Sequence, residues 1–145
     1  MKRILITLLA LIIINCGGST TSNEVTAITI GSKGNEMKYD TTEFTVSAGA
    51  TVKLTMKNNA SMENMIHNVV IILDESAVTD IVRYAEMNGG NPIMPNSDIL
   101  AVTSLADLGE EVSVEFIAPK KPGRYLYICT YTAHAATMRG YMIVE

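Results

Sequence analysis

A thiol, an imidazole and a thioether stand close together near the C-terminus of this chain. Cys129, His134 and Met138 share one short stretch with the spacing Cys-x4-His-x3-Met. One cysteine, two histidines and a weakly bound axial methionine are the ligands of a blue-copper site. This stretch supplies three of the four. The fourth has one candidate, because His67 is the only other histidine in the 145 residues.

Each of these residue types also has an ordinary structural use. A lone cysteine in an apolar strand is usually a small buried hydrophobe, and methionine often fills gaps in a core. A lone histidine is usually packed or solvated without binding anything. A metal is favoured here because the two spacings between cysteine, histidine and methionine agree within one stretch, and because His67 lies at the end of a strand in the strand-like run 64–73. The sequence therefore predicts one copper ion held by His67, Cys129, His134 and Met138.

The N-terminus has the features of an export signal. Lys2 and Arg3 precede an apolar run at 4–14, which is too short to span a bilayer. The cysteine that follows, Cys16, resembles the processing site of a bacterial lipoprotein. We expect a signal peptide over 1–15, acylation of Cys16, and a protein anchored by lipid to a bacterial membrane, facing the periplasm or the cell surface. The alternative is a stray cysteine beside an ordinary cleavage site.

Residues 16–24 are small and polar, so they predict either a flexible tether or simply a disordered N-terminus, ahead of one domain at 25–145. No structural disulfide is expected, because both cysteines already have roles.

Loss of the two basic leader residues leaves 9 basic and 15 acidic side chains, a net charge near −6. This acidity argues against nucleic acid as a partner and allows docking to basic redox proteins.

Short strands separated by turns dominate the domain. Alternation is clearest at Val52, Leu54 and Met56, which would share one face of a strand. The candidate strands are 25–30, 37–39, 43–46, 51–56, 66–73, 99–102, 110–117, 124–129 and 140–144. Seven or eight strands drawn from these nine candidates predict an all-β Greek-key sandwich or barrel.

One helix interrupts the strands. Apolar residues recur at helical spacing over 76–87, and Asn88-Gly89-Gly90 would end the helix. Residues 91–108 contain two prolines and read as a loop with at most one short strand. In such a sandwich His67 and Cys129 would come from strand ends at one pole. The Cys129 to Met138 segment would join the last two strands there, on a scaffold that stays rigid when the metal changes oxidation state.

These residues resemble the cupredoxins, and within them the azurin and auracyanin group. The resemblance covers roughly 25–145. The matching segments are Gly34-Asn35-Glu36-Met37 with Phe44-Thr45-Val46, His67-Asn68, the helical flap, Tyr125 to Thr130, and the Cys-x4-His-x3-Met loop followed by Arg139-Gly140. Azurins carry Gly before the first ligand histidine, with its carbonyl near the copper axis, where this chain has Ile66. They have Phe-Pro-Gly at the positions of 131–133 and an N-terminal disulfide that this chain lacks.

The resemblance implies a role for each site residue. Nδ1 of His67, Sγ of Cys129 and Nδ1 of His134 would form a trigonal plane around copper. Sδ of Met138 would be the long axial contact. Two further residues, Asn68 and Thr130, would tie the ligand segments together and aim an amide at the thiolate, which raises the reduction potential. They would otherwise be polar strand-end residues that satisfy the backbone.

The expected function is that of a one-electron carrier, with electrons passing through the edge of His134. Its partners would be c-type cytochromes or other copper or haem proteins. Five residues could form an apolar docking patch around His134, or else fill the core: Met62, Met65, Met94, Ala133 and Ala135. The alternatives are a lipid-anchored copper carrier or chaperone and a metal-free β-sandwich interaction module. An enzyme is not expected, since there is no second ligand set and nothing indicates a catalytic pocket.

Overall fold

A computed structural model describes residues 24–145, which form eight strands and one α-helix. The strands are β1 (Thr26–Gly31), β2 (Glu43–Val46), β3 (Thr51–Lys57), β4 (Val70–Ile72), β5 (Ile99–Val102), β6 (Glu111–Ile117), β7 (Gly123–Ile128) and β8 (Arg139–Val144). The helix is α1 (Val78–Met87), preceded by a 3-10 turn at Glu75–Ala77. This confirms the predicted all-β fold with one helical flap. The predicted signal peptide and Cys16 lie outside the described residues, as does the predicted tether except for Glu24.

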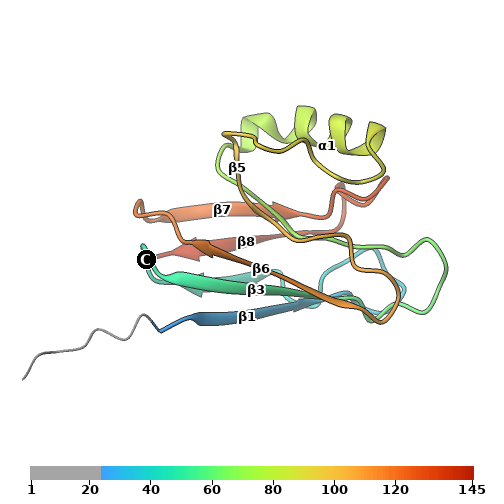
Figure 1. Cartoon of the computed structure of the whole chain (residues 1–145), viewed down its shortest axis with the longest axis horizontal. Helices are drawn as coiled ribbons and strands as arrows, with labels where there is room; N and C mark the ends of the chain where they lie inside the picture. The colour runs from blue at the N-terminus through green and yellow to red at the C-terminus, as the bar shows by residue number, and fades with distance from the viewer. Residues whose placement is uncertain (1–23) are drawn as a thin grey trace, which may run out of the picture.

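Two sheets stack face to face (Figure 1). The smaller has the order β1-β3-β6, and the larger has the order β2-β8-β7-β4-β5. β1 pairs in parallel with β3, and β2 pairs in parallel with β8, while the other pairs are antiparallel. Both parallel pairs join strands that are not consecutive in the chain, so the connections cross between the sheets.

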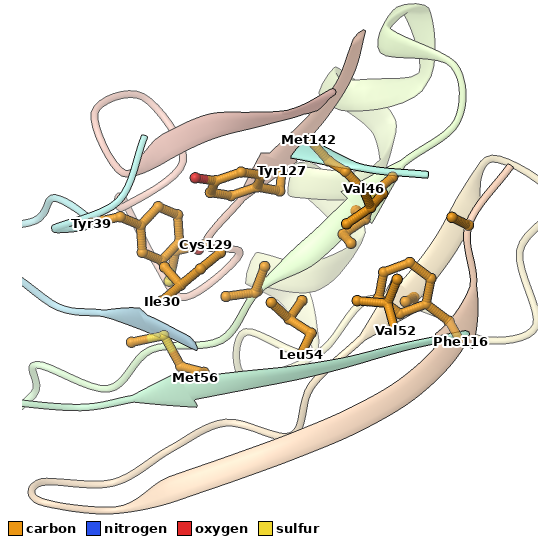
Figure 2. Packing of buried hydrophobic residues seen from close by; sticks show 14 of the residues in the cluster. Ile30, Tyr39, Val46, Val52, Leu54, Met56, Phe116, Tyr127, Cys129 and Met142 are labelled. Carbon is orange, nitrogen blue, oxygen red and sulfur yellow. The ribbon is translucent and has the colours of Figure 1, made fainter. Parts of the chain in front are cut away.

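The main core lies between the two sheets. Val52, Leu54 and Met56 of β3 are fully buried and alternate with exposed or half-exposed neighbours, as their spacing predicts. Burying each such side chain contributes roughly 1.5–3 kcal/mol. Figure 2 shows Cys129 at the same end of this core as Tyr39, whereas Val52 and Phe116 lie toward the other end. The site therefore sits at one pole of a well-packed sandwich.

A second, smaller core explains the unbroken apolar run before the helix. α1 covers the outer face of the larger sheet (Figure 1) and packs Ile81 against a cluster that includes Val70 and Ile72. β4 is therefore buried on both faces, which removes the polar alternation of an exposed strand.

Within the described residues, no helix is both long and apolar enough to cross a membrane.

Three predicted boundaries are wrong. Residues 37–39 form no strand; only Tyr39 makes an isolated bridge, with Ser32, because the preceding residues close a turn through the Lys33 amide and the Lys38 carbonyl (2.9 Å). The predicted strand 66–73 is reduced to β4, with His67 bridged singly to Ala106. The helix begins at Val78, two residues after the predicted start at position 76.

The late start of the helix follows from the turn in front of it. The carboxylate of Asp74 accepts a hydrogen bond from the Ser76 amide at 2.9 Å. This caps a 3-10 turn rather than an α-helical one, so α-helical geometry begins only at Val78.

Candidate metal centre

The structure brings the predicted ligands together from separate parts of the chain. His67 lies three residues before β4, and Cys129 directly follows β7. His134 and Met138 belong to the connection between β7 and β8. His67, Cys129 and Met138 are fully buried, and His134 is 3% exposed.

The three nitrogen and sulfur donors form a small triangle. Nδ1 of His67 lies 3.2 Å from Nδ1 of His134, and the Cys129 sulfur lies 4.0 Å from the first nitrogen and 3.6 Å from the second. Metal–nitrogen bonds of roughly 2.0 Å and metal–sulfur bonds of roughly 2.3 Å, about 120° apart, would separate donors by roughly 3.5–3.7 Å. The triangle therefore fits one ion at its centre.

The donor set is that of a blue-copper site. A thiolate and a thioether are soft ligands, imidazole nitrogens also suit copper, and two histidines with one cysteine and an axial methionine are the blue-copper combination. Met138 is buried in the same core cluster as Cys129. These four residues are arranged as a type 1 copper site.

Backbone hydrogen bonds fold the ligand loop into a compact turn. The Cys129 amide donates to the Met138 carbonyl at 3.0 Å, which closes the loop at its base. The amide of Met138 donates in turn to the His134 carbonyl at 2.9 Å, and that of His134 to the Tyr131 carbonyl at 3.0 Å. Ala133 has a φ of 67°, in the region that favours glycine. Three of the ligands thus share one rigid turn.

Asn68 and Thr130 join the two ligand segments. The Thr130 amide donates to Oδ1 of Asn68 at 2.9 Å, and the Asn68 side-chain amide donates to the Thr130 hydroxyl at 2.9 Å. Both residues are fully buried. The predicted contact between these two residues, each of which follows a ligand in the chain, is therefore present. Ile66, which takes the place of the azurin glycine before the first ligand histidine, is half-buried.

Sequence reasoning missed Asn58, which supports the His67 segment. Its side-chain amide donates to the Met65 carbonyl at 2.7 Å and to the Ala106 carbonyl at 3.1 Å. Ala106 also exchanges backbone hydrogen bonds with His67. The sequence does contain a signal for this role. Asn58 continues the inward-facing alternation of β3, and a polar side chain buried there needs hydrogen-bond partners.

Burial sets the protonation of the donors. It raises the pKa of the Cys129 thiol to about 11, an effect that hydrogen bonds from the backbone amides of Asn68 and Tyr131 partly oppose. Burial and the adjacent His134 lower the pKa of His67 to about 4, and burial also lowers the pKa of His134. At neutral pH both imidazoles are therefore neutral and can bind metal, while the thiol must release its proton.

We expect the copper-free protein to lose stability as the pH falls below the ordinary histidine pKa of 6.5. The unfolded chain takes up a proton at His67 near that value, whereas the folded chain resists protonation until about pH 4. Acid therefore favours the unfolded chain between these two values. Urea midpoints at pH 7, 6 and 5 measure the effect. Bound copper should not abolish the effect, because the metal keeps the imidazoles unprotonated in the folded chain while the unfolded chain still takes up protons. Equal midpoints without copper would contradict the buried-imidazole account.

The predicted docking patch is only partly exposed. Met62 is 57% and Met94 47% exposed, and Ala133 also reaches the surface. Met65 and Ala135 are buried, at 8% and 7% exposed, so their inclusion was wrong. Ala135 instead packs in the small core under α1.

Comparison with known proteins gives a consistent result. Residues 26–145 match the sequence profile described as copper binding proteins, plastocyanin/azurin family. Auracyanin-A of Chloroflexus aurantiacus is 36% identical over 159 aligned residues, covering 100% of this chain and 96% of the relative. Azurin iso-2 of Methylomonas sp. strain J is 30% identical, covering 77% and 92%.

Solved structures agree with the sequence matches. The structure titled auracyanin A, a "blue" copper protein from Chloroflexus aurantiacus, superposes with a TM-score of 0.78 at 37% identity, covering 84% of this chain and 100% of that one. Dithionite-reduced auracyanin from Roseiflexus castenholzii gives a TM-score of 0.73 at 35% identity, covering 83% and 97%. With the buried His-Cys-His triangle and Met138 beside it, these matches show that the chain belongs to the plastocyanin/azurin family of copper-binding proteins.

Proposed function

We propose that this protein is a one-electron carrier between redox proteins at a membrane. The observation that carries the proposal is the buried triangle of donors at 3.2–4.0 Å, held by contacts of the protein itself. Bound copper would supply a one-electron couple between its cuprous and cupric states. The protein's part is to hold the ligands in one arrangement that serves both states.

Rigidity of the ligands supports this role. The base of the loop is closed by the pairing of Cys129 with Met138, and Asn68 ties the His67 segment to Thr130. None of these contacts involves the metal, so the geometry does not depend on it. Preorganised ligands move little when charge changes, which favours fast electron transfer.

We place electron exchange at His134. His67 is fully buried and Cys129 lies deep in the main core, whereas His134 retains slight exposure. The ring of Tyr131 packs edge-on against His134, with centroids 5.2 Å apart. The segment between β3 and β4, which carries the exposed Met62, lies at the same end of the sandwich as the ligand loop (Figure 1). A partner docking on this end would approach the imidazole edge.

The proposed partners are c-type cytochromes or other copper or haem proteins with a basic docking face. An acidic carrier attracts such a face over distances near the Debye length, so association should weaken as salt is added.

Electron self-exchange tests the proposed docking end. Met62→Glu should slow self-exchange at least tenfold, because two added carboxylates face each other when two molecules meet at this end. Ile117→Glu is the matched control, since Ile117 is 56% exposed on β6, the strand that runs away from the ligand loop (Figure 1). It should change the rate less than twofold, and neither variant should alter the absorption spectrum.

Equal self-exchange rates in Met62→Glu and Ile117→Glu would contradict docking at this end of the sandwich. Slow exchange in the parent protein, combined with rapid loss of copper to a copper-free acceptor, would favour the copper-carrier alternative over electron transfer.

We also propose that the protein is exported and anchored to a bacterial membrane by a lipid on Cys16. The basic and apolar leader followed by cysteine supports this. In bacteria expressing the full chain, Cys16→Ala should release the protein from the membrane fraction and abolish labelling by palmitate, while the blue colour remains. Membrane association and labelling that survive the change would contradict lipid anchoring.

A further inference from the structure

We propose that Gly90, just after the end of α1, is a positioning residue for the copper site. Its carbonyl oxygen anchors the Thr130 side chain, and its missing side chain lets the turn after α1 sit directly on Tyr131. The expected effect on the copper ion rests on the proposed function. The positioning of Thr130 and Tyr131 by Gly90 is expected with or without metal.

The carbonyl of Gly90 fixes the direction of the Thr130 hydroxyl. That hydroxyl has one proton and two nearby acceptors, the Gly90 carbonyl at 2.7 Å and Oδ1 of Asn68 at 3.3 Å. The shorter contact receives the proton, so a lone pair of the hydroxyl faces the Asn68 side-chain amide at 2.9 Å. The same amide also reaches the Gly90 carbonyl at 3.4 Å. All three residues are buried.

The fixed Asn68 side chain in turn positions the backbone around the Cys129 sulfur. With its amide held, Asn68 presents Oδ1 to the Thr130 backbone N–H at 2.9 Å. Thr130 stands between Cys129 and Tyr131, and the backbone amides of Asn68 and Tyr131 are the two that hydrogen-bond to the Cys129 sulfur. Holding Asn68 and Thr130 therefore holds both sulfur donors.

A side chain at this position would be crowded against Tyr131. A Cβ on Gly90 would stand 3.1 Å from Cα of Tyr131 and 3.0 Å from Cδ2 of its ring. The backbone cannot yield easily, because the Gly90 amide is itself bound to the Ala85 carbonyl of the last turn of α1 at 2.7 Å. Any side chain here pushes the Gly90 carbonyl and Tyr131 apart.

The neighbouring glycine is a matched control. Gly89 has a φ of 63° and Gly90 a φ of 91°, so alanine strains the backbone at both positions. A Cβ on Gly89 meets nothing within 4 Å. The two alanine variants thus share the backbone strain of a positive φ but differ in the contact with Tyr131.

Amide hydrogen exchange in the copper-free protein gives the first test. Gly90→Ala should speed exchange of the Thr130 amide at least tenfold, whereas Gly89→Ala should change it less than threefold. Thr130→Val, which removes the hydroxyl at nearly constant volume, should loosen the Asn68 side chain and speed exchange at residue 130, and Thr130→Ser should restore protection. The threonine pair decides the question if Gly90→Ala does not fold.

The copper-loaded variants give the second test. Weaker hydrogen bonds to the thiolate leave more charge on sulfur, so Gly90→Ala and Thr130→Val should lower the reduction potential and shift the thiolate-to-copper band. Gly89→Ala should leave both as in the parent, and Thr130→Ser should lie nearer to the parent than Thr130→Val. Equal exchange rates and equal potentials in the two glycine variants would overturn the proposal. Altered amide exchange without any blue copper would leave the positioning role standing and remove the proposed function instead.

Discussion

Replacing Cys129 with serine removes the intense thiolate-to-copper absorption band completely. The band requires a thiolate bonded to copper, and a serine hydroxyl neither ionises at neutral pH nor supplies a soft sulfur donor. The Cys129 sulfur is also one corner of the triangle of donors, 3.6 Å and 4.0 Å from the two imidazole nitrogens. The measurement is the visible spectrum of the variant after addition of one equivalent of cupric ion.

A matched control separates loss of the ligand from general damage. The second cysteine of the chain, Cys16, lies in the leader region, so Cys16→Ser should keep the band at full strength. Thermal unfolding of copper-free Cys129→Ser should still be cooperative, because serine fits the same buried space. A blue band that persists in Cys129→Ser would mean that the sulfur ligand is misassigned.

Replacing Gly140 with alanine destabilises the fold by about 3 kcal/mol, the upper end for overpacking a well-filled core. A Cβ there would collide with the Tyr127 ring and hydroxyl, and would stand 2.6 Å from the Thr42 carbonyl. Neither neighbour can move away freely. The Tyr127 hydroxyl donates to the Thr41 carbonyl at 2.6 Å, and the Thr42 carbonyl accepts the Tyr141 amide at 2.9 Å. Urea unfolding of the copper-free protein measures the loss.

Gly49→Ala provides the comparison for this prediction. Gly49 has a φ of 75°, and a Cβ at this position would meet nothing within 4 Å, so alanine there costs only backbone strain, about 1 kcal/mol. A Gly140→Ala protein no less stable than Gly49→Ala would contradict the tight packing of β8 against Tyr127.

The ligands and most strands could be predicted because each has a local signal. Cysteine, histidine and methionine in one loop carry their own spacing, and the alternation of Val52, Leu54 and Met56 indicates the buried face of β3. The length of β4 could not be predicted from the apolar run 66–73. Its limits are set by distant partners, the bridge to Ala106 and the side chain of Asn58, which no local pattern reveals.

The support around the ligands was the least predictable part of the site. Gly90 reads in the sequence only as a helix terminator, because its contacts with Thr130 and Tyr131 cross forty residues of chain. Tyr39 donates its hydroxyl proton to the Asn68 carbonyl at 2.6 Å, yet its own segment has only the local pattern of a strand. Such contacts depend on how the two sheets stack.

Copper titration of the metal-free protein, followed by absorption and paramagnetic resonance, tests the central claim most directly. The account predicts that an intense thiolate-to-copper band grows linearly and saturates at one copper per chain, with a single cupric signal throughout. A titration that yields no such band, or one that saturates at a different copper content, would contradict a single copper site built from His67, Cys129, His134 and Met138.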